Sequence, residues 1–382
     1  MPFTGKATYA AGAALPELAE DVADLVAIAA GHETPLLDLL GDARRPARSV
    51  VHEWLEDAPI PNRTTLVTFA GPNDFTVSDP ERLCVNDQVR VVGSGEVMRV
   101  TAIDDSDVTV ERGYGGTTQE TPADGDELEI LGSAALEGAD AAPARFTTRS
   151  RLTNVTQIFA ATVEISGSEL AANQAGVADE MEYQKAMRLR ELVRELESSV
   201  INGVADATPP GGNLAGDATS PRTMRGIIAS LQTHRFTAGV NGFPADTDLT
   251  EAQLNLALRT IWQSGGTGVD TIVVGGRQKR AINAFAADAR RFAASSERFK
   301  DLVGIYESDF GVCRVILSRS VPAGTALLLD SDRIGVLPLA GRSFSFKSLA
   351  RTGDREAGQI VGEYTLELRN EASHGLITGL AA

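Results

Sequence analysis

One long, uninterrupted helical pattern occurs in the 382 residues of this chain, and it covers residues 179–202. Apolar side chains recur there at helical spacing and predict an amphipathic helix with one broad apolar stripe. Asp179, followed by Glu182, is typical of a capping box, and Gly203 predicts a left-handed stop. Such a helix is about 36 Å long. We interpret it as a structural spine, because it carries no paired histidine, cysteine or metal-binding carboxylate. The predicted stripe consists of Tyr183, Ala186, Met187, Leu189, Leu192, Val193, Leu196 and Val200.

The composition indicates a folded chain without membrane spans. Hydrophobic residues make up 43% and charged residues 23%, which permits one or two domains with cores of their own. No run of about 18 apolar residues occurs, and the first residues lack the pattern of a secretory signal. We therefore expect synthesis in a cytosol. Cys84 and Cys313 lie far apart, which favours two buried thiols over a disulfide or a zinc site.

The net charge of −17 is unevenly distributed. Residues 1–62 carry −6, residues 63–146 carry −10, and residues 147–382 carry only −1. Such a chain is poorly suited to sequence-specific binding of nucleic acid, because phosphate contacts need clustered Lys and Arg. Lysine is scarce, and none occurs between Lys6 and Lys185.

The first 48 residues resemble an arm more than a domain. Residues 15–30 predict an amphipathic helix, and residues 36–40 form a short apolar turn. Residues 49–57 read as an extended strand whose natural partner lies in residues 146–165. Between them, residues 63–133 consist of short strands and turns at roughly ten-residue spacing. This pattern predicts a small β-barrel or sandwich inserted into a long hairpin.

The second half of the chain alternates helices and strands after a Pro/Gly-rich loop at 204–220. Gly275 and Gly276 precede Arg277, Lys279 and Arg280, which suggests either a phosphate cradle or a simple strand-to-helix turn. The turn is favoured, since no phosphate-loop spacing is present. The last forty residues predict a long β-hairpin packed on the spine. The predicted helices are 224–234, 250–263 and 277–287, and the predicted strands before the hairpin are 271–274, 312–318, 325–329 and 333–337.

No catalytic apparatus is visible in the sequence. His32, His52, His234 and His374 lie in four separate segments, none in a metal-binding motif. Nucleophile motifs are missing, and the acidic pairs lie in turn-like sequence. We therefore predict no catalytic, cofactor-binding or metal-binding residues, and no cofactor.

Several stretches in colinear order resemble tailed-bacteriophage major capsid proteins of the Hong Kong 97 type. The branch they resemble carries a β-domain inserted in its extended loop, the E-loop. The resemblance covers nearly the whole chain. The stretches are GHETPLLDLLG, EVMRVTAIDDSDVTVERGYGGT, DEMEYQKAMRLRELVRELESSVING, YESDFGVCRVILSRSVPAGTALLLD and LARTGDREAGQIVGEYTLELRNEASHGLITGL.

The resemblance implies an α+β fold of five parts. Residues 1–48 would be the N-terminal arm, residues 49–61 and 146–166 the E-loop strands, and residues 62–145 the inserted domain. The peripheral P-domain would comprise residues 167–203, with the spine, and residues 341–382. The axial A-domain would comprise residues 204–340.

It also implies a function and partners. The chain would self-assemble in hundreds of copies, as hexamers and pentamers, into an icosahedral shell around double-stranded DNA. Assembly in the host bacterial cytoplasm, a portal, a decoration or cement protein, and non-specific contact with packaged DNA would follow. Only some 48 residues precede the E-loop, which implies a separate scaffolding protein. The E-loop has no Lys to donate to a covalent cross-link found in some members.

Two other functions stay open at this point. One is an encapsulin-like nanocompartment shell with the same fold, and the other is a hydrolase carrying a β-type binding module at 63–133. If the chain forms a shell, charge pairs between subunits should help to hold it. The basic side of those pairs is predicted to be Arg44, Arg45, Arg48, Arg149, Arg151, Arg351 and Arg355.

Overall fold

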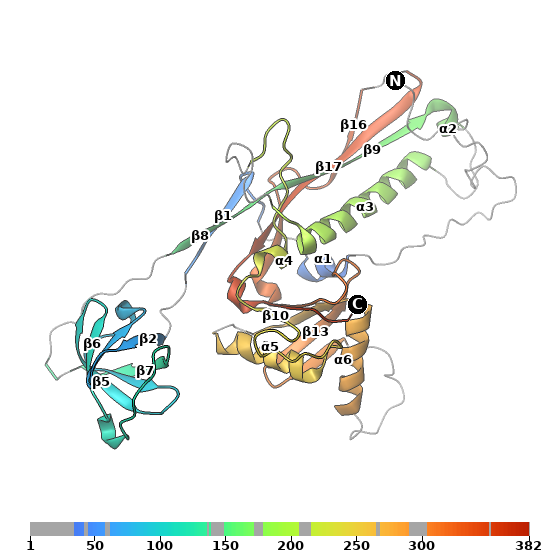
Figure 1. Ribbon diagram of the computed structural model, residues 1–382. Coiled ribbons are helices and arrows are strands. Elements are labelled where there is room, and N and C mark those ends of the chain that lie inside the picture. The colour runs from blue at the N-terminus through green and yellow to red at the C-terminus, as the bar shows by residue number, and fades with distance from the viewer. Residues whose placement is uncertain are drawn as a thin grey trace. The chain divides into compact units, whose positions relative to one another are not determined.

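A computed structural model describes residues 34–41, 45–57, 62–135, 137–138, 149–171, 179–205, 215–264, 268–289, 304–350 and 353–381 (Figure 1). The chain divides into two compact units. One comprises Met1–Trp54 with Arg151–Ala382, and the other comprises Leu55–Ser150. The predicted helix at 15–30 lies outside the described residues, as do Arg44 and Arg351.

The spine helix α3 spans Glu180–Asn202, as the sequence predicts. The side chain of Asp179 accepts a hydrogen bond from the Glu182 amide at 3.1 Å. The expected left-handed stop is wrong, because Gly203 has a φ of −53°. Glycine is needed there for another reason. A Cβ would lie 2.4 Å from the carbonyl oxygen of Ser199 and 2.6 Å from that of Met224.

The apolar stripe of α3 is buried only in its C-terminal half. Leu192, Leu196 and Val200 belong to the larger core of the first unit, together with Ile201, which the stripe prediction omitted. Leu189 is 39% exposed, and Tyr183 and Met187 are only partly buried. Within one chain, the first three turns of the predicted stripe are therefore only partly covered.

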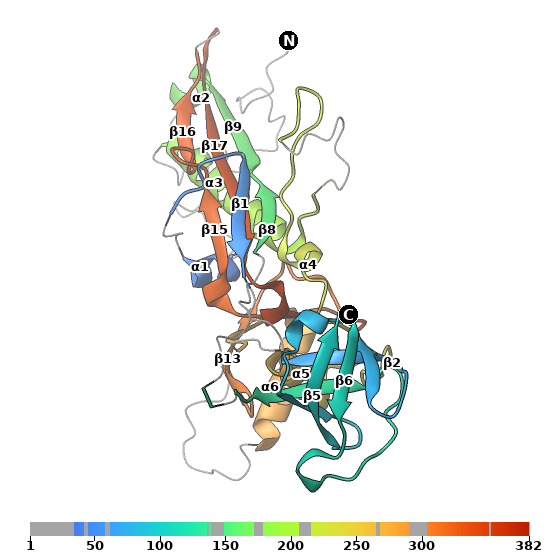
Figure 2. The ribbon, with the colours of Figure 1, turned by 90° about the vertical axis from the view of Figure 1, so that its left-hand side faces the viewer.

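A long antiparallel ribbon lies beside α3 (Figures 1 and 2). Strand β17 pairs with β9 over ten residue pairs, from Arg355 opposite Ser166 to Tyr364 opposite Gln157. Rings from the segment of β16 cover two glycines of β17, Gly358 under Phe346 and Gly362 under Phe344. The strands are β9 (Gln157–Ser166), β15 (Ile334–Pro338), β16 (Ser345–Ser348) and β17 (Arg355–Leu368), with β17 between β15 and β16 on one edge and β9 on the other.

A six-stranded mixed sheet forms another large part of the first unit. Its strand order is β10-β18-β14-β11-β13-β12, and apolar cores cover both faces of its central strands. Helix α5 (Glu251–Gln263) begins with a capping box at Thr250 and Gln253, and α6 spans Gly276–Ala289. The strands are β10 (Arg235–Thr237), β11 (Thr271–Val274), β12 (Ile305–Ser308), β13 (Gly311–Leu317), β14 (Ala326–Leu329) and β18 (Gly375–Thr378).

Two predictions for this region are wrong. The helix expected at 224–234 is reduced to α4, Ile227–Ser230, followed by strand β10. The last strand, β18, does not extend the C-terminal hairpin. It pairs with β14 and β10 in the six-stranded sheet, because its apolar residues Leu376 and Ile377 fill the cores on its two faces.

The second unit contains a closed six-stranded barrel. Its strand order is β2-β3-β6-β5-β4-β7, with Val89, Met98 and Leu128 among the fully buried side chains inside. The barrel alternative is thus confirmed over the sandwich. Strand β3, which was not among the predicted strands, pairs with β2 and β6 and completes the barrel. The strands are β2 (Arg63–Phe69), β3 (Asp74–Val77), β4 (Asp87–Val91), β5 (Val97–Asp104), β6 (Asp107–Glu111) and β7 (Glu127–Ser133), with short 3-10 turns η3 (Pro80–Arg82) and η4 (Tyr114–Gly116).

Strands β1 (Val51–Glu56) and β8 (Ser150–Val155) form a separate two-stranded pair. The partner predicted for residues 49–57 is therefore confirmed. Two short helices remain, α2 (Gly167–Ala171) and α1 (Pro35–Leu40), and α1 occupies the predicted apolar turn with Leu36 fully buried.

Candidate functional site

The seven arginines predicted to pair between subunits mostly find partners inside the chain. Arg45 lies 3.4 Å from Glu367, Arg151 lies 3.5 Å from Glu53, and Arg149 lies 3.7 Å from Asp57. Arg355 pairs with Glu164, and Arg48 is exposed. The five arginines in the described ranges therefore have different ion-pair partners or, in the case of Arg48, none there, and the contact of all seven with neighbouring subunits stays a prediction.

A buried carboxylate at the end of β17 contacts three basic side chains. Glu367 is almost fully buried, and its Oε2 lies 2.6 Å from Nε2 of His52 on β1. Arg369 and Arg45 approach its Oε1. The hydrogen bond from His52 and the adjacent Arg369 lower the pKa of Glu367 to about 2 against the cost of burial. A carboxylate that is ionised in this way ties strand β1 to β17.

A second carboxylate lies four residues earlier on the same face of β17. Oε1 of Glu363 accepts a hydrogen bond at 2.6 Å from Oγ1 of Thr156, at the junction of β8 and β9. Arg222 also donates to it, and Nε of Arg342 lies 2.6 Å from Oε2. Burial raises the pKa of Glu363, but the hydrogen bonds from Thr156 and Arg222 outweigh it and leave the pKa lowered.

Glu363 and Glu367, here called the carboxylate strip, fix the chain where β1 and β8 leave the first unit. Asn154 of β8 strengthens this junction. Its amide donates to the carbonyl oxygens of Arg225 and Leu366 at 2.9 and 2.8 Å and accepts from the Arg225 amide. The base of the β1–β8 pair is therefore held by charged and polar contacts.

A third buried carboxylate holds helix α1 on the spine. Glu197 of α3 is fully buried and accepts hydrogen bonds from the amides of Leu36 and Leu37 at 3.1 and 3.3 Å. Ser318, just past β13, donates its hydroxyl at 2.7 Å. These two amides belong to the unpaired first turn of α1, where negative charge is favoured. Burial is the main cause of the raised pKa of Glu197.

Sequence reasoning missed all three carboxylates. Thr156 and Arg222 lie 207 and 141 positions from Glu363, and His52 and Arg45 lie 315 and 322 positions from Glu367, so no local pattern signals these contacts. A signal for Glu197 did exist. It occupies the register of the buried stripe, one turn after Val193 and next to Leu196, where a solvated acid is not expected.

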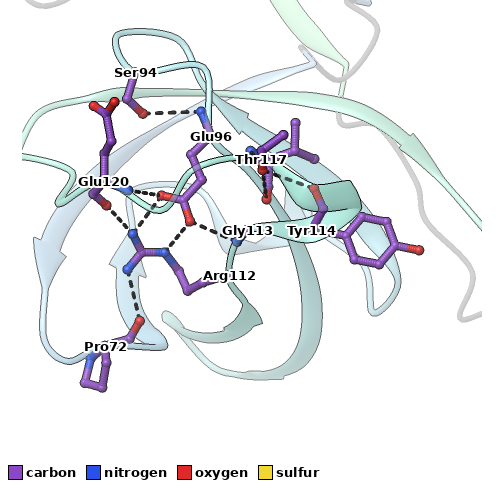
Figure 3. A network of polar contacts seen from close by, with 9 residues as sticks. Pro72, Ser94, Glu96, Arg112, Gly113, Tyr114, Thr117 and Glu120 are labelled. Atoms are coloured by element: carbon purple, nitrogen blue, oxygen red, sulfur yellow. Dashed lines mark hydrogen bonds and ion pairs between the residues drawn. The ribbon is translucent and has the colours of Figure 1, made fainter.

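The barrel contains its own buried ion pair (Figure 3). Nε and Nη2 of Arg112 lie 2.6 and 2.7 Å from the two carboxylate oxygens of Glu96, which is 1% exposed. Glu96 also accepts the amides of Gly113 and Glu120, both at 3.1 Å. Arg112 donates further to the carbonyl oxygen of Pro72. Each carboxylate oxygen of Glu96 thus accepts two hydrogen bonds, from Arg112 and from a backbone amide. The pair supports the loop 113–120, and its carboxylate has no free acceptor position for chemistry.

The residues first considered for chemistry lie apart. Arg277 pairs with Asp248, and Lys279 donates to the carbonyl oxygen of Val315, in keeping with a strand-to-helix turn. Burial raises the pKa of Cys313 to about 12, so its thiol stays protonated. Within the described ranges, no group of three His, Cys, Asp or Glu side chains could hold a metal ion. No described helix is both long and apolar enough to span a membrane.

Solved structures of low sequence identity share the fold. The capsid of cyanophage A-1(L) matches with a TM-score of 0.55 and 13% identity, covering 96% of this chain and 98% of that one. The capsid of the native GTA particle has a TM-score of 0.50 and 12% identity, with coverage of 97% and 99%. The predicted α+β capsid fold of the Hong Kong 97 type is thereby confirmed.

Sequence comparison gives the family. The model of the SU10 major capsid protein matches residues 3–381, and the chain belongs to that family. It is therefore a structural protein of the virion that assembles in many copies into a capsid shell. None of the curated proteins matches it. The SrpI encapsulin of Synechococcus elongatus PCC 7942 matches 62% of this chain and 78% of its own, with 13% identity and a TM-score of 0.42. The family match decides between the two shell classes in favour of the capsid.

Proposed function

We propose that the chain forms hexamers and pentamers that close into an icosahedral shell around double-stranded DNA, without catalytic activity. The family match over residues 3–381 carries this proposal. Electron cryomicroscopy of the expressed full-length chain tests it. Closed shells with sixfold and fivefold capsomers are expected, and a small soluble oligomer would contradict it.

Within this shell, the β1–β8 pair is the extended loop, and the barrel is a domain inserted in it. The supporting observation is that the compact unit Leu55–Ser150 interrupts the other unit in sequence. The carboxylate strip gives the loop a fixed base, because Glu363 and Glu367 bind residues on both strands or their continuations. The domain boundaries implied by the resemblance remain part of this proposal.

The barrel should face outward or lie between capsomers. Residues 63–146 have a net charge of −10, which suits solvent or a basic neighbour and repels packaged DNA. A separate scaffolding protein, a portal and a decoration protein are the further partners we propose, with assembly in the bacterial cytoplasm. Strong protection of the barrel from hydrogen exchange on the inner side of filled particles would contradict this orientation.

The shell should be held without covalent links. Residues 49–166 contain no Lys, and Cys84 and Cys313 form no disulfide in the structure. Buried area and charge pairs then supply the stability. Particles boiled in detergent should give one band near 40 kDa on a denaturing gel, matching the chain mass of 40.3 kDa. A ladder of covalent oligomers would show that this expectation is wrong.

A further inference from the structure

The six-stranded sheet has one edge that is only half covered. Strands β11 and β14, at its centre, are buried on both faces. In the hairpin of β12 and β13, Tyr306 and Cys313 are buried on one face, whereas the other face is exposed to solvent. The residues on this exposed face are Ile305, Glu307, Val312 and Arg314, here called the hairpin face.

The hairpin face combines large apolar and charged side chains in a regular arrangement. Ile305 stands opposite Arg314, and Glu307 stands opposite Val312. Ile305 is 60% and Val312 58% exposed. Strand β12 is also the outermost strand of the sheet and contains neither Pro nor Lys, the residues that commonly block pairing at an edge. These features are those of a contact surface rather than of a solvated face.

A second copy of this chain is the partner that the shell provides. Copies arranged around a rotation axis of higher order than two meet through two different surfaces, so the hairpin face needs a different surface on its neighbour. The opposite edge of the same sheet, β10, offers one, since Arg235 is exposed there.

The strand registers place Arg235 on the same side of the sheet as the hairpin face. Residues paired across neighbouring strands lie on the same side of a sheet. Arg235 pairs with Leu376, which pairs with Leu327, and this pairing continues through Val273 to Ile316. Ile316 lies two residues after Arg314 in β13 and therefore on the same side as Arg314. In the described part of the chain, neither Arg235 nor Glu307 forms an ion pair. Glu307 of the hairpin face and Arg235 of the β10 edge are thus exposed charges of opposite sign, and Arg314 is the second charge of the hairpin face.

We propose that the hairpin face of one copy docks against the β10 edge of the next copy, with Glu307 facing Arg235. Ile305 and Val312 supply the apolar area that is removed from water in this contact. The inference rests on the proposed ring-shaped capsomers and identifies the surfaces through which neighbouring copies meet.

Cysteine cross-linking tests the contact in full-length, assembled particles. The double variant Glu307→Cys with Arg235→Cys, oxidised and run on a non-reducing denaturing gel, should give dimers and higher oligomers. Each single variant should remain monomeric. Particles of the double variant that yield only monomer would overturn the inference, and so would equally strong dimers from Glu307→Cys alone, which indicate a two-fold contact.

Charge reversal gives an independent measurement. Glu307→Arg should lower the yield of closed particles at least tenfold, and adding Arg235→Glu should restore it. Glu81→Arg, at an exposed position of the barrel, is the matched control and should not change the yield. Normal yield from Glu307→Arg overturns the inference alone. Absence of particles from the unmodified chain overturns the proposed function and the inference together.

Discussion

Buried glutamates show how the environment of a side chain decides its ionisation in this protein. Glu367 has three basic neighbours and a pKa lowered to about 2, whereas Glu197 meets only amides and a hydroxyl and has a raised pKa. Paired charge favours the carboxylate, and desolvation without a counter-charge favours the acid. The two residues therefore respond to pH in opposite directions.

For Glu367, stability should be lost as the pH falls. Its folded pKa is lowered from 4.5 to about 2, so its contribution is present above pH 4.5 and disappears as the pH approaches 2. Glu367→Gln should remove up to about 3 kcal/mol of this acid-dependent stability. Urea unfolding of the subunit between pH 2 and 6 measures it. An unchanged pH profile in the variant would contradict the assignment.

For Glu197, the sign is reversed. Because its pKa is raised above 4.5, its contribution to stability is largest below pH 4.5 and falls as the pH rises. Glu197→Gln keeps an acceptor for the amides of Leu36 and Leu37 and should be at least as stable as the natural chain at pH 7. Glu197→Ala leaves those amides without an acceptor and should cost about 1–3 kcal/mol. Equal stability of the Ala and Gln variants in urea would refute this role.

At the scale of single elements, the buried ion pair of Arg112 and Glu96 should contribute most to the stability of the barrel. Arg112→Ala leaves the Glu96 carboxylate buried without its counter-charge, which should cost about 3–5 kcal/mol. Hydrogen exchange should become faster in residues 113–120. The control is Arg63→Ala, which removes the exposed pairs with Glu127 and Glu129 and should have little effect. Equal losses in both variants would mean that burial of the pair is unimportant.

Elements with a strong local period could be predicted from the sequence. Helices α3 and α5, strand β11 and the pairing of β1 with β8 all agree with the pattern of their residues. The sheet to which strand β18 belongs could not be predicted, because the sequence of an apolar strand does not indicate which sheet it joins. Residues 224–234 read as a helix, yet the backbone there packs closely against the end of α3 through Gly203 and Gly226, which leaves room for only one turn.

The candidate site was far less accessible to sequence reasoning than the fold. The sequence allowed arginines to be proposed as members of charge pairs, but it did not identify the acidic residues with which they pair. Arg45 and Arg151 find Glu367 and Glu53 through the tertiary fold, and Glu363 was not considered at all. Charge pairing depends on the distance between side chains in the folded structure, and the periodic pattern of hydrophobic residues carries no information about that distance.

For the whole molecule, the arm should be essential for closing the shell. Deletion of residues 1–48 removes α1, whose Leu36 is buried in the core and whose amides bind Glu197. Capsomers should still form, but closed shells should not. Sedimentation and negative-stain microscopy distinguish the two, with circular dichroism as the control for folding of the truncated chain. Closed shells of normal size would disprove the prediction.

The contacts of Glu367 also have a consequence for the timing of synthesis. Its partners Arg45 and His52 precede it by 322 and 315 residues, so the base of the loop cannot close until nearly the entire chain has left the ribosome. Contacts of such long range form late. A nascent chain therefore lacks the contacts that fix the base of the loop, and we expect unfinished copies on one polysome to associate less readily than completed chains.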